Sequence, residues 1–133
     1  MTLNEFIEET GIVLTSEWTE RNPHMEDSGR MDNWRVKLRN KKLGKTMRLY
    51  FSKGVGHNGA EPTIDEVLDC LASDAAGIDN SNGFDDWCDE YGYDPDSRRA
   101  EKIYKQCERQ AERLKKFLGP DQYEQLLWNI DRL

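Results

Sequence analysis

Two neighbouring stretches of the chain alternate strictly between apolar and polar residues. In the first, residues 33–39, apolar residues such as Val36 and Leu38 occupy every second position. The second, residues 45–52, repeats the pattern, and a period of two is typical of half-buried strands. Residues 40–44 end in glycine and predict a turn. The sequence therefore predicts an antiparallel hairpin with one apolar face and one basic face.

An earlier stretch, residues 12–20, is rich in β-branched residues and also predicts a strand. Its two faces hold Ile12, Leu14, Ser16 and Trp18 on one side and Val13, Thr15, Glu17 and Thr19 on the other. Before it, Thr2 and Glu5 have capping-box spacing and predict a short helix that ends at Gly11. Residues 21–30 contain proline and glycine and predict a loop. A three-stranded antiparallel meander follows from these elements.

After the glycine-rich residues 54–59, the apolar residues recur with the period of a helix and no longer with that of a strand. Thr63 and Glu66 form a second capping box, and the helix that they begin is expected to end at Gly77. A short helix is predicted for residues 83–92. Its expected buried residues are Phe84, Trp87, Cys88 and Tyr91.

The last third of the chain predicts two more helices. Asp94 is a favourable cap, and Pro95 suits the first position of a helix. A long apolar stripe follows as far as Gly119 and Pro120, which break it. A final helix is predicted for residues 121–133.

The expected fold class is α+β, with an N-terminal three-stranded antiparallel meander followed by about four helices. A chain of 133 residues is long enough for one domain with a core. We therefore expect a single domain over residues 1–133. Residues 1–53 would form a short helix plus the meander, and residues 54–133 would form the helical part.

Charge is distributed very unevenly along the chain. Residues 54–97 hold twelve acidic residues and no Lys or Arg, whereas residues 30–53 hold nine basic residues and one acid. The net charge of −7 is therefore a sum of unlike parts. A net negative charge disfavours non-specific adhesion to DNA or to an anionic membrane. A function that depends on charge would therefore depend on a local charged surface and not on the net charge.

The basic face of the hairpin has two interpretations. Lys and Arg on the outer face of a sheet protect it from aggregation at its edges. Cations around an aromatic ring also suit single-stranded nucleic acid or RNA. The residues of this candidate site are Arg35, Lys37, Arg39, Arg48 and Tyr50.

The acidic segment has three interpretations. It can be a solvated helical face that keeps the protein soluble, or it can pair with the basic hairpin. It can also imitate the phosphate backbone and occupy a nucleic-acid-binding protein, because several of its acids recur at one helical turn. The candidate contact residues are Asp65, Asp69, Asp85, Asp86, Asp89 and Glu90.

Enzyme classes find little support in the sequence. Residues 54–59 match G-x-G-x-x-G, but three residues separate them from the next helix and the strands read as antiparallel, so a turn is favoured over a nucleotide site. A nucleophilic pair of His57 with Cys70 or Cys88 is conceivable, although thiols on apolar stripes are inert. The paired carboxylates show no convergence on a metal site. We expect no catalysis, no metal and no cofactor.

The three cysteines, Cys70, Cys88 and Cys107, fit neither a disulfide framework nor a metal spacing. They are expected to be buried free thiols in a reducing cytoplasm. No apolar run approaches the length of a membrane span. These features predict a soluble protein of the cytoplasm, without membrane contact and with no prediction of its oligomeric state.

Five segments resemble a family of small accessory proteins encoded by phages and prophages. They are residues 47–52, 67–76, 84–87, 90–98 and 126–130. The resemblance spans nearly the whole chain and implies a phage origin, but it brings no catalytic residue. Small acidic phage proteins often antagonise host nucleic-acid machinery, including restriction and CRISPR complexes, so the resemblance implies a similar role by association only.

Two functions follow from these observations. The first is a non-enzymatic phage protein that binds and inhibits a host nucleic-acid-handling or defence complex, of the anti-CRISPR or anti-restriction type, through its acidic surface. The partner would be a host protein or nucleoprotein complex. The alternative is a single-stranded nucleic-acid-binding module that uses the basic hairpin.

Overall fold

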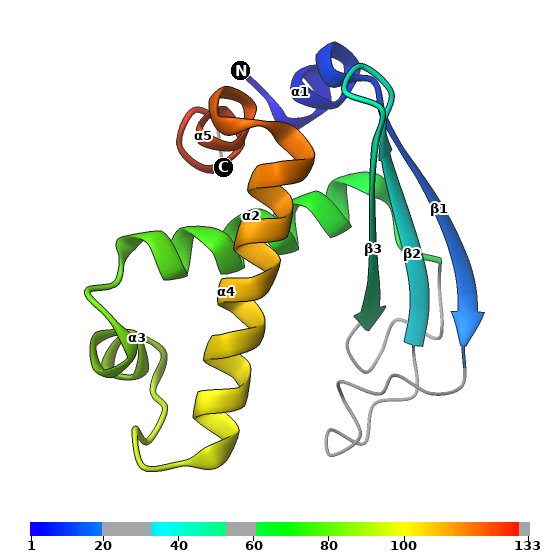
Figure 1. Ribbon diagram of the computed structural model, residues 1–133. Helices are drawn as coiled ribbons and strands as arrows, with labels where there is room; N and C mark the ends of the chain where they lie inside the picture. Colours follow the sequence, from blue (N-terminus) through cyan, green and yellow to red (C-terminus); the bar gives the residue numbers. More distant parts are fainter. Residues whose placement is uncertain (20–32, 53–60, 131–133) are drawn as a thin grey trace. The chain divides into compact units, whose positions relative to one another are not determined.

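The computed structural model describes residues 1–19, 33–52 and 61–130 (Figure 1). The chain forms two compact units, Thr2–Val67 and Leu68–Leu133, and Met1 belongs to the second. The division falls inside a helix, later than the boundary after residue 53 that the change of period suggested.

The fold class is α+β, as the sequence predicts. The described residues hold five helices rather than about four, because one short helix precedes the sheet and four follow it. The predicted loop at residues 21–30, the glycine-rich residues 54–59, His24 and His57 lie outside the described residues. The single domain over residues 1–133 stays a prediction.

The first unit is built around a three-stranded sheet. Its strands are β1 (Ile12–Thr19), β2 (Asn33–Asn40) and β3 (Lys45–Ser52). They pair antiparallel in the order β1-β2-β3, so the predicted meander is confirmed. The turn between β2 and β3 is closed by Asn40, whose side-chain oxygen accepts a hydrogen bond from the Leu43 backbone N–H at 3.3 Å.

One face of this sheet is apolar and buried. Val36, Leu38 and Met47 are each at most 2% exposed, and they are the positions that the alternation assigns to the inner face. Burial of each such side chain stabilises the fold by about 1.5–3 kcal/mol relative to leaving it in water. The alternate positions on these strands carry mostly polar residues, whose side chains point to the opposite, outer face of the sheet.

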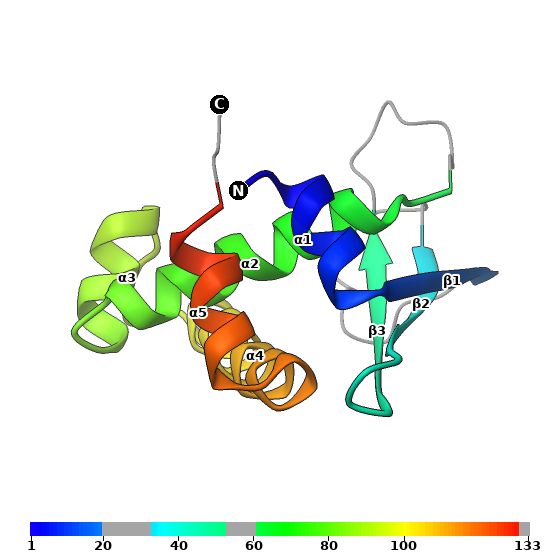
Figure 2. The ribbon, with the colours of Figure 1, turned by 90° about the horizontal axis from the view of Figure 1, so that it is seen from above.

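Helix α1 (Leu3–Thr10) precedes β1 and lies at the same end of the sheet as the β2–β3 turn (Figures 1 and 2). Its predicted capping box is confirmed, because Thr2 and Glu5 exchange hydrogen bonds of 3.1 and 3.2 Å. Gly11 ends the helix in the left-handed conformation. The Lys42 ammonium in the turn donates a hydrogen bond to the Glu9 carbonyl oxygen.

Helix α2 (Ile64–Asn80) begins at the second predicted capping box, with the Glu66 N–H donating to Thr63 Oγ1 at 3.4 Å. It does not end at Gly77, where the sequence predicted its end. Gly77 is buried inside the helix, and a Cβ atom there would lie 2.4 Å from Tyr91 Oη. The glycine therefore provides space for a neighbouring ring rather than a helix stop.

Helix α3 (Phe84–Tyr91) packs through an aromatic cluster in the second unit. Trp87 is 4% exposed and stacks on Tyr93 with ring centroids 4.9 Å apart. Tyr104 meets Trp87 edge-on at 5.3 Å. The prediction that Tyr91 is buried is wrong: the residue is 49% exposed, although its ring contacts that of Trp87 at 5.6 Å.

Helix α4 (Arg98–Leu118) begins four residues after the predicted cap. Asp94 instead forms a turn, in which its Oδ1 accepts the Asp96 N–H at 3.0 Å and its carbonyl accepts the Ser97 N–H at 3.0 Å. Ser97 is the N-cap, and its Oγ accepts the Ala100 N–H at 3.3 Å. The Asp side chain is used within the turn, so the cap passes to the next suitable residue.

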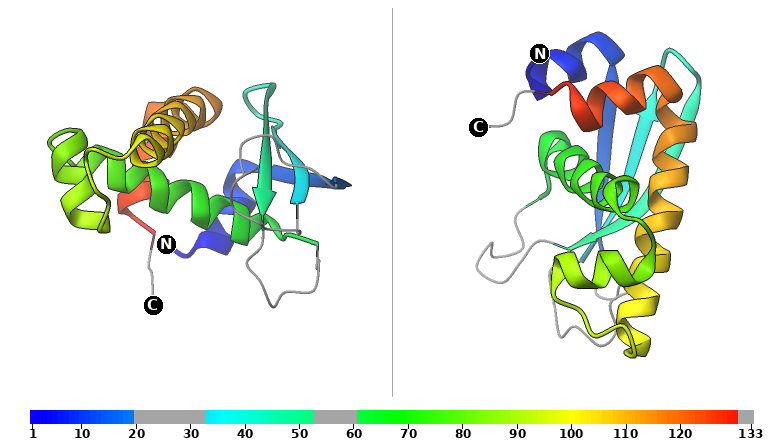
Figure 3. Two further views of the ribbon diagram at one scale, coloured as in Figure 1. Left: turned by 90° about the horizontal axis from the view of Figure 1, so that it is seen from below. Right: turned by 90° about the vertical axis from the view of Figure 1, so that its left-hand side faces the viewer.

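Helix α4 crosses α2 in the second unit and is followed by α5 (Pro120–Trp128) (Figure 3). The predicted break is confirmed, since Gly119 ends α4 and Pro120 opens α5. The Tyr123 hydroxyl donates a hydrogen bond to Asp79 Oδ2 at 3.1 Å and so ties α5 to α2. None of the described helices is both long and apolar enough to cross a bilayer.

Candidate binding surfaces

The register of the sheet brings the five predicted basic-hairpin residues onto one face. Arg35 lies opposite Tyr50, and Lys37 lies opposite Arg48. Arg39 occupies the next position of the same parity on β2. Because side chains two residues apart on a strand point the same way, these residues share the outer face of the sheet. We call Arg35, Lys37, Arg39, Arg48 and Tyr50 the basic face.

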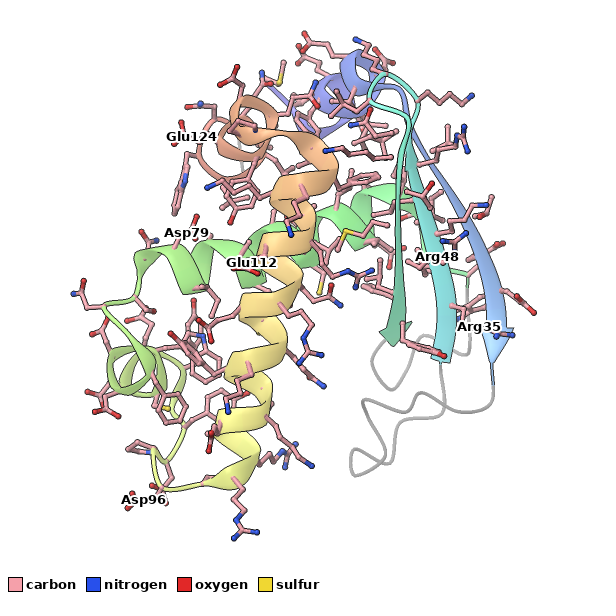
Figure 4. The ribbon with its side chains drawn as sticks, in the orientation of Figure 1. Arg35, Arg48, Asp79, Asp96, Glu112 and Glu124 are labelled. Atoms are coloured by element: carbon pink, nitrogen blue, oxygen red, sulfur yellow. The ribbon has the colours of Figure 1, made fainter. Side chains whose placement is uncertain are left out.

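The basic face is accessible to solvent. Arg35, Arg39 and Arg48 are exposed, and Lys37 and Tyr50 are half-buried. Figure 4 labels Arg35 and Arg48, whose side chains project from the same side of the sheet. The long side chains can reach a ligand, while the strand backbones that carry them are held by the paired ladder.

Sequence reasoning missed a fifth charged residue on this face, Glu17, which joins the four cations and Tyr50. The register places Glu17 opposite Arg35, and Arg35 Nη2 lies 3.1 Å from Glu17 Oε1. Their side chains are 53% and 72% exposed, so the ion pair is worth about 0–1 kcal/mol. The alternation did assign Glu17 to one face of its strand, but only the strand pairing says which basic residue it meets.

The three strands contribute very different side chains to this outer face. The column on β2 holds three cations, and the column on β3 holds Thr46, Arg48 and Tyr50. The column on β1 holds Val13, Thr15 and Glu17 and no cation. The positive charge therefore follows β2 and β3 and stops at β1.

The acidic residues of α3 cover the face of the helix that points away from its aromatic core. Asp85, Asp86, Asp89 and Glu90 are all exposed, whereas Trp87 and Cys88 are buried. The Asp86 carboxylate accepts the Asn82 backbone N–H at 3.0 Å. Asp86 thus helps to fix the start of α3, in addition to any contact that it could make with a partner.

The remaining two predicted contact residues lie on α2. Asp65 and Asp69 are exposed and four residues apart, so they lie one turn apart on the same side of that helix. Asp65 belongs to the first unit, whereas Asp69 and the acids of α3 belong to the second. The six predicted residues are therefore divided between the two units.

The negative charge around α3 affects a buried thiol. The pKa of Cys88 is raised first by burial and then by the negative charges of Asp85, Asp89 and Asp94. Asp94, which sequence reasoning did not include among the contact residues, thus adds to the same negative field. A thiol with a raised pKa is a poor nucleophile at neutral pH, so Cys88 fits a packing role.

The other two cysteines differ in their surroundings. Cys107 is half-buried on α4, and its pKa is raised to about 12 by burial, then by Asp74 and Cys70 on α2. Cys70 is exposed, so the prediction that all three thiols are buried is wrong for this residue. The pKa of Asp74 is raised by desolvation, although the residue as a whole is exposed.

Within the described ranges, no three His, Cys, Asp or Glu side chains gather in a way that could hold a metal ion. Neither a scan of protein-family models nor searches of curated proteins and of solved structures found a match to this chain. Its function is therefore inferred from its own residues and their geometry.

Proposed function

We propose that this protein binds single-stranded nucleic acid through the basic face. The observation that carries the proposal is the position of Lys37 directly opposite Arg48. Like charges in directly opposite positions destabilise a sheet. An anion bound between the two strands would interact favourably with both cations.

The spacing of the cations suits a polyanion. Arg35, Lys37 and Arg39 are each two residues apart on β2, which gives a repeat of about 6.6–6.8 Å along an extended strand. A row of cations can follow the phosphates of an extended nucleic-acid strand. Tyr50, beside Arg35, adds an aromatic surface on which a base can stack, which is worth about 1–3 kcal/mol per base.

The net charge of −7 acts against this binding at long range. Its effect is to weaken attraction to polyanions everywhere except near the basic face. We therefore expect modest affinity that is lost steeply as salt rises. With four cations, the slope of log K against log salt should be about −3 at most, because each contact with a single strand contributes about −0.7.

The test is fluorescence anisotropy of a labelled single-stranded oligonucleotide at low salt. The double variant Lys37→Gln/Arg39→Gln removes two cations from the middle and end of the basic face, and its affinity should fall by at least about tenfold. Arg99→Gln/Lys102→Gln, at exposed positions of α4, is the matched control because it changes the net charge equally. Equal binding by the two double variants, or no binding by the unaltered protein, would refute the proposal.

A second candidate function is supported by the charges of α3. Asp89 and Glu90 lie in the last turn of this helix, which holds no basic residue. Anions there oppose the helix dipole at a cost of about 0.3–1 kcal/mol, and the pairs Asp85–Asp89 and Asp86–Glu90 repel at i,i+4 spacing. We infer a protein partner with a basic surface, such as a host nucleic-acid-handling or defence complex that a phage protein would inhibit.

The variant Asp89→Lys/Glu90→Lys tests this second candidate. It suits the helix dipole and keeps Asp86 in place, so α3 should be at least as stable as before. Glu108→Lys/Glu112→Lys, on exposed positions of α4 (Glu112 is labelled in Figure 4), changes the net charge equally. A protein captured from nuclease-treated bacterial lysate by the control but not by the α3 variant would support the candidate. Equal capture by both variants would rule it out.

A further inference from the structure

The carboxylate of Glu17 is the only acidic group that the outer face of the described sheet carries. It lies on β1, beside the positive columns of β2 and β3, and its Oε1 is 3.1 Å from Arg35 Nη2. As a structural element, an opposite-charge pair across two strands stabilises their register by about 0.2–1 kcal/mol. Because Glu17 lies at the border of the positive charge, its carboxylate also bears on which nucleic acids the face can bind.

We propose that Glu17 makes the basic face selective for a single nucleic-acid strand over a duplex. This inference rests on the proposed function and deepens it. A single strand needs one line of cations, and the columns of β2 and β3 supply it. A duplex brings a second line of phosphates to the same face, and that line meets β1, which holds no cation on this face and one carboxylate.

The width of the sheet and the groove widths of a duplex are of the same order. Neighbouring strands are about 4.7–4.9 Å apart, so β1 lies about 9–10 Å from β3. The grooves that separate the two backbones of B-DNA are about 6 and 12 Å wide. The β1–β3 distance lies between these two widths, so a duplex whose first backbone follows the cations of β2 and β3 extends toward the β1 side of the face. There the Glu17 carboxylate repels phosphates and also competes with them for Arg35.

The experiment compares two probes against two variants of the full chain. The probes are a labelled single-stranded DNA oligonucleotide and the duplex of the same sequence, at low salt. The variants are Glu17→Gln and the control Glu8→Gln, which is exposed on α1 in the same unit and changes the net charge equally. Thermal unfolding of each variant checks that the sheet is intact.

We expect the unaltered protein and Glu8→Gln to prefer the single strand to the same degree. In Glu17→Gln, the preference for the single strand over the duplex should fall by about two- to five-fold, the range expected for one exposed charge. If Glu17→Gln changes both affinities by the same factor, the inference is wrong while the proposed function stands. If the unaltered protein binds neither probe, the proposed function fails, and this inference fails with it.

Discussion

Lys37 and Arg48 lie directly opposite one another on adjacent antiparallel strands of the sheet. Both belong to the outer face, while the residues on either side of them in the chain, such as Val36 and Leu38, are buried on the inner face. The inner face fixes the register, because a shift by one residue would expose the apolar set. The two cations are thus held in opposition by apolar packing behind them.

This opposition predicts a conflict between stability and binding at Lys37. Lys37→Gln should raise the free energy of unfolding by about 0.2–1 kcal/mol, because one of two opposed charges is removed. The same change should reduce the salt slope of nucleic-acid binding by about 0.7. Urea denaturation and anisotropy titrations measure the two effects. Lys41→Gln, in the exposed turn, is the control, and a loss of stability in Lys37→Gln would contradict the prediction.

The contact between Gly77 and Tyr91 predicts strong coupling between the two residues. Replacing a helical glycine by alanine ordinarily stabilises a helix by about 0.5–1 kcal/mol. Here the new Cβ would lie 2.4 Å from Tyr91 Oη and 3.0 Å from Cζ. We therefore expect Gly77→Ala to stabilise the protein only when Tyr91→Ala has removed the ring. A double-mutant cycle should give a coupling energy of about 0.5–3 kcal/mol, and additive effects would show that the ring moves aside freely.

Ser97 is predicted to carry the N-cap energy of α4. Ser97→Ala should lower the free energy of unfolding by about 1 kcal/mol, because it leaves the Ala100 N–H without the hydroxyl acceptor that it now has. Ser97→Asp keeps an acceptor and should retain most of the stability. Thermal denaturation of both variants measures this. A neutral Ser97→Ala would show that the Ser97 hydroxyl contributes no N-cap energy and would contradict the prediction.

Asp74 predicts a pH-dependent difference between the protein and its Asp74→Asn variant. Desolvation raises the pKa of Asp74 above its ordinary value of 3.8, so the folded state binds this proton more tightly than the unfolded state. Its contribution to the free energy of unfolding is therefore most favourable below pH 3.8 and declines as the pH rises through the raised value. Asp74→Asn should be more stable than the unaltered protein at neutral pH, with the advantage vanishing in acid. Denaturation curves of both proteins, measured across the pH range, test this prediction. An advantage of Asp74→Asn that grows as the pH falls would contradict it.

Local patterns predicted most of the secondary structure. The strands, both capping boxes and the break at Gly119 depend on periods and hydrogen bonds within a few residues. Gly77 and Asp94 were misread because each has two uses with the same sequence signature. A glycine can end a helix or make room for a ring, and an Asp can cap a helix or close a turn. Which use applies depends on Tyr91 in one case and on Ser97 in the other.

On the candidate surfaces, too, local patterns predicted some features, and others depend on contacts between residues. The alternation along β2 and β3 alone was enough to place Arg35, Lys37 and Arg48 on one face. It could not reveal Glu17 as a neighbour of Arg35, because the two are 18 residues apart and meet only through the register of β1 with β2. Nor could it reveal that Asp86 is engaged by the Asn82 N–H.

The sequence by itself determined which residues are apolar at strand or helix period, and hence the sheet, its basic face and the acidic outer face of α3. These follow because the side-chain direction repeats every two residues in a strand and every 3.6 in a helix. The tertiary structure alone decided the pairs that meet across elements: Lys37 with Arg48, Glu17 with Arg35, and Tyr91 with Gly77. Such contacts depend on strand register and helix packing, and both are set by the burial of apolar surface from distant parts of the chain.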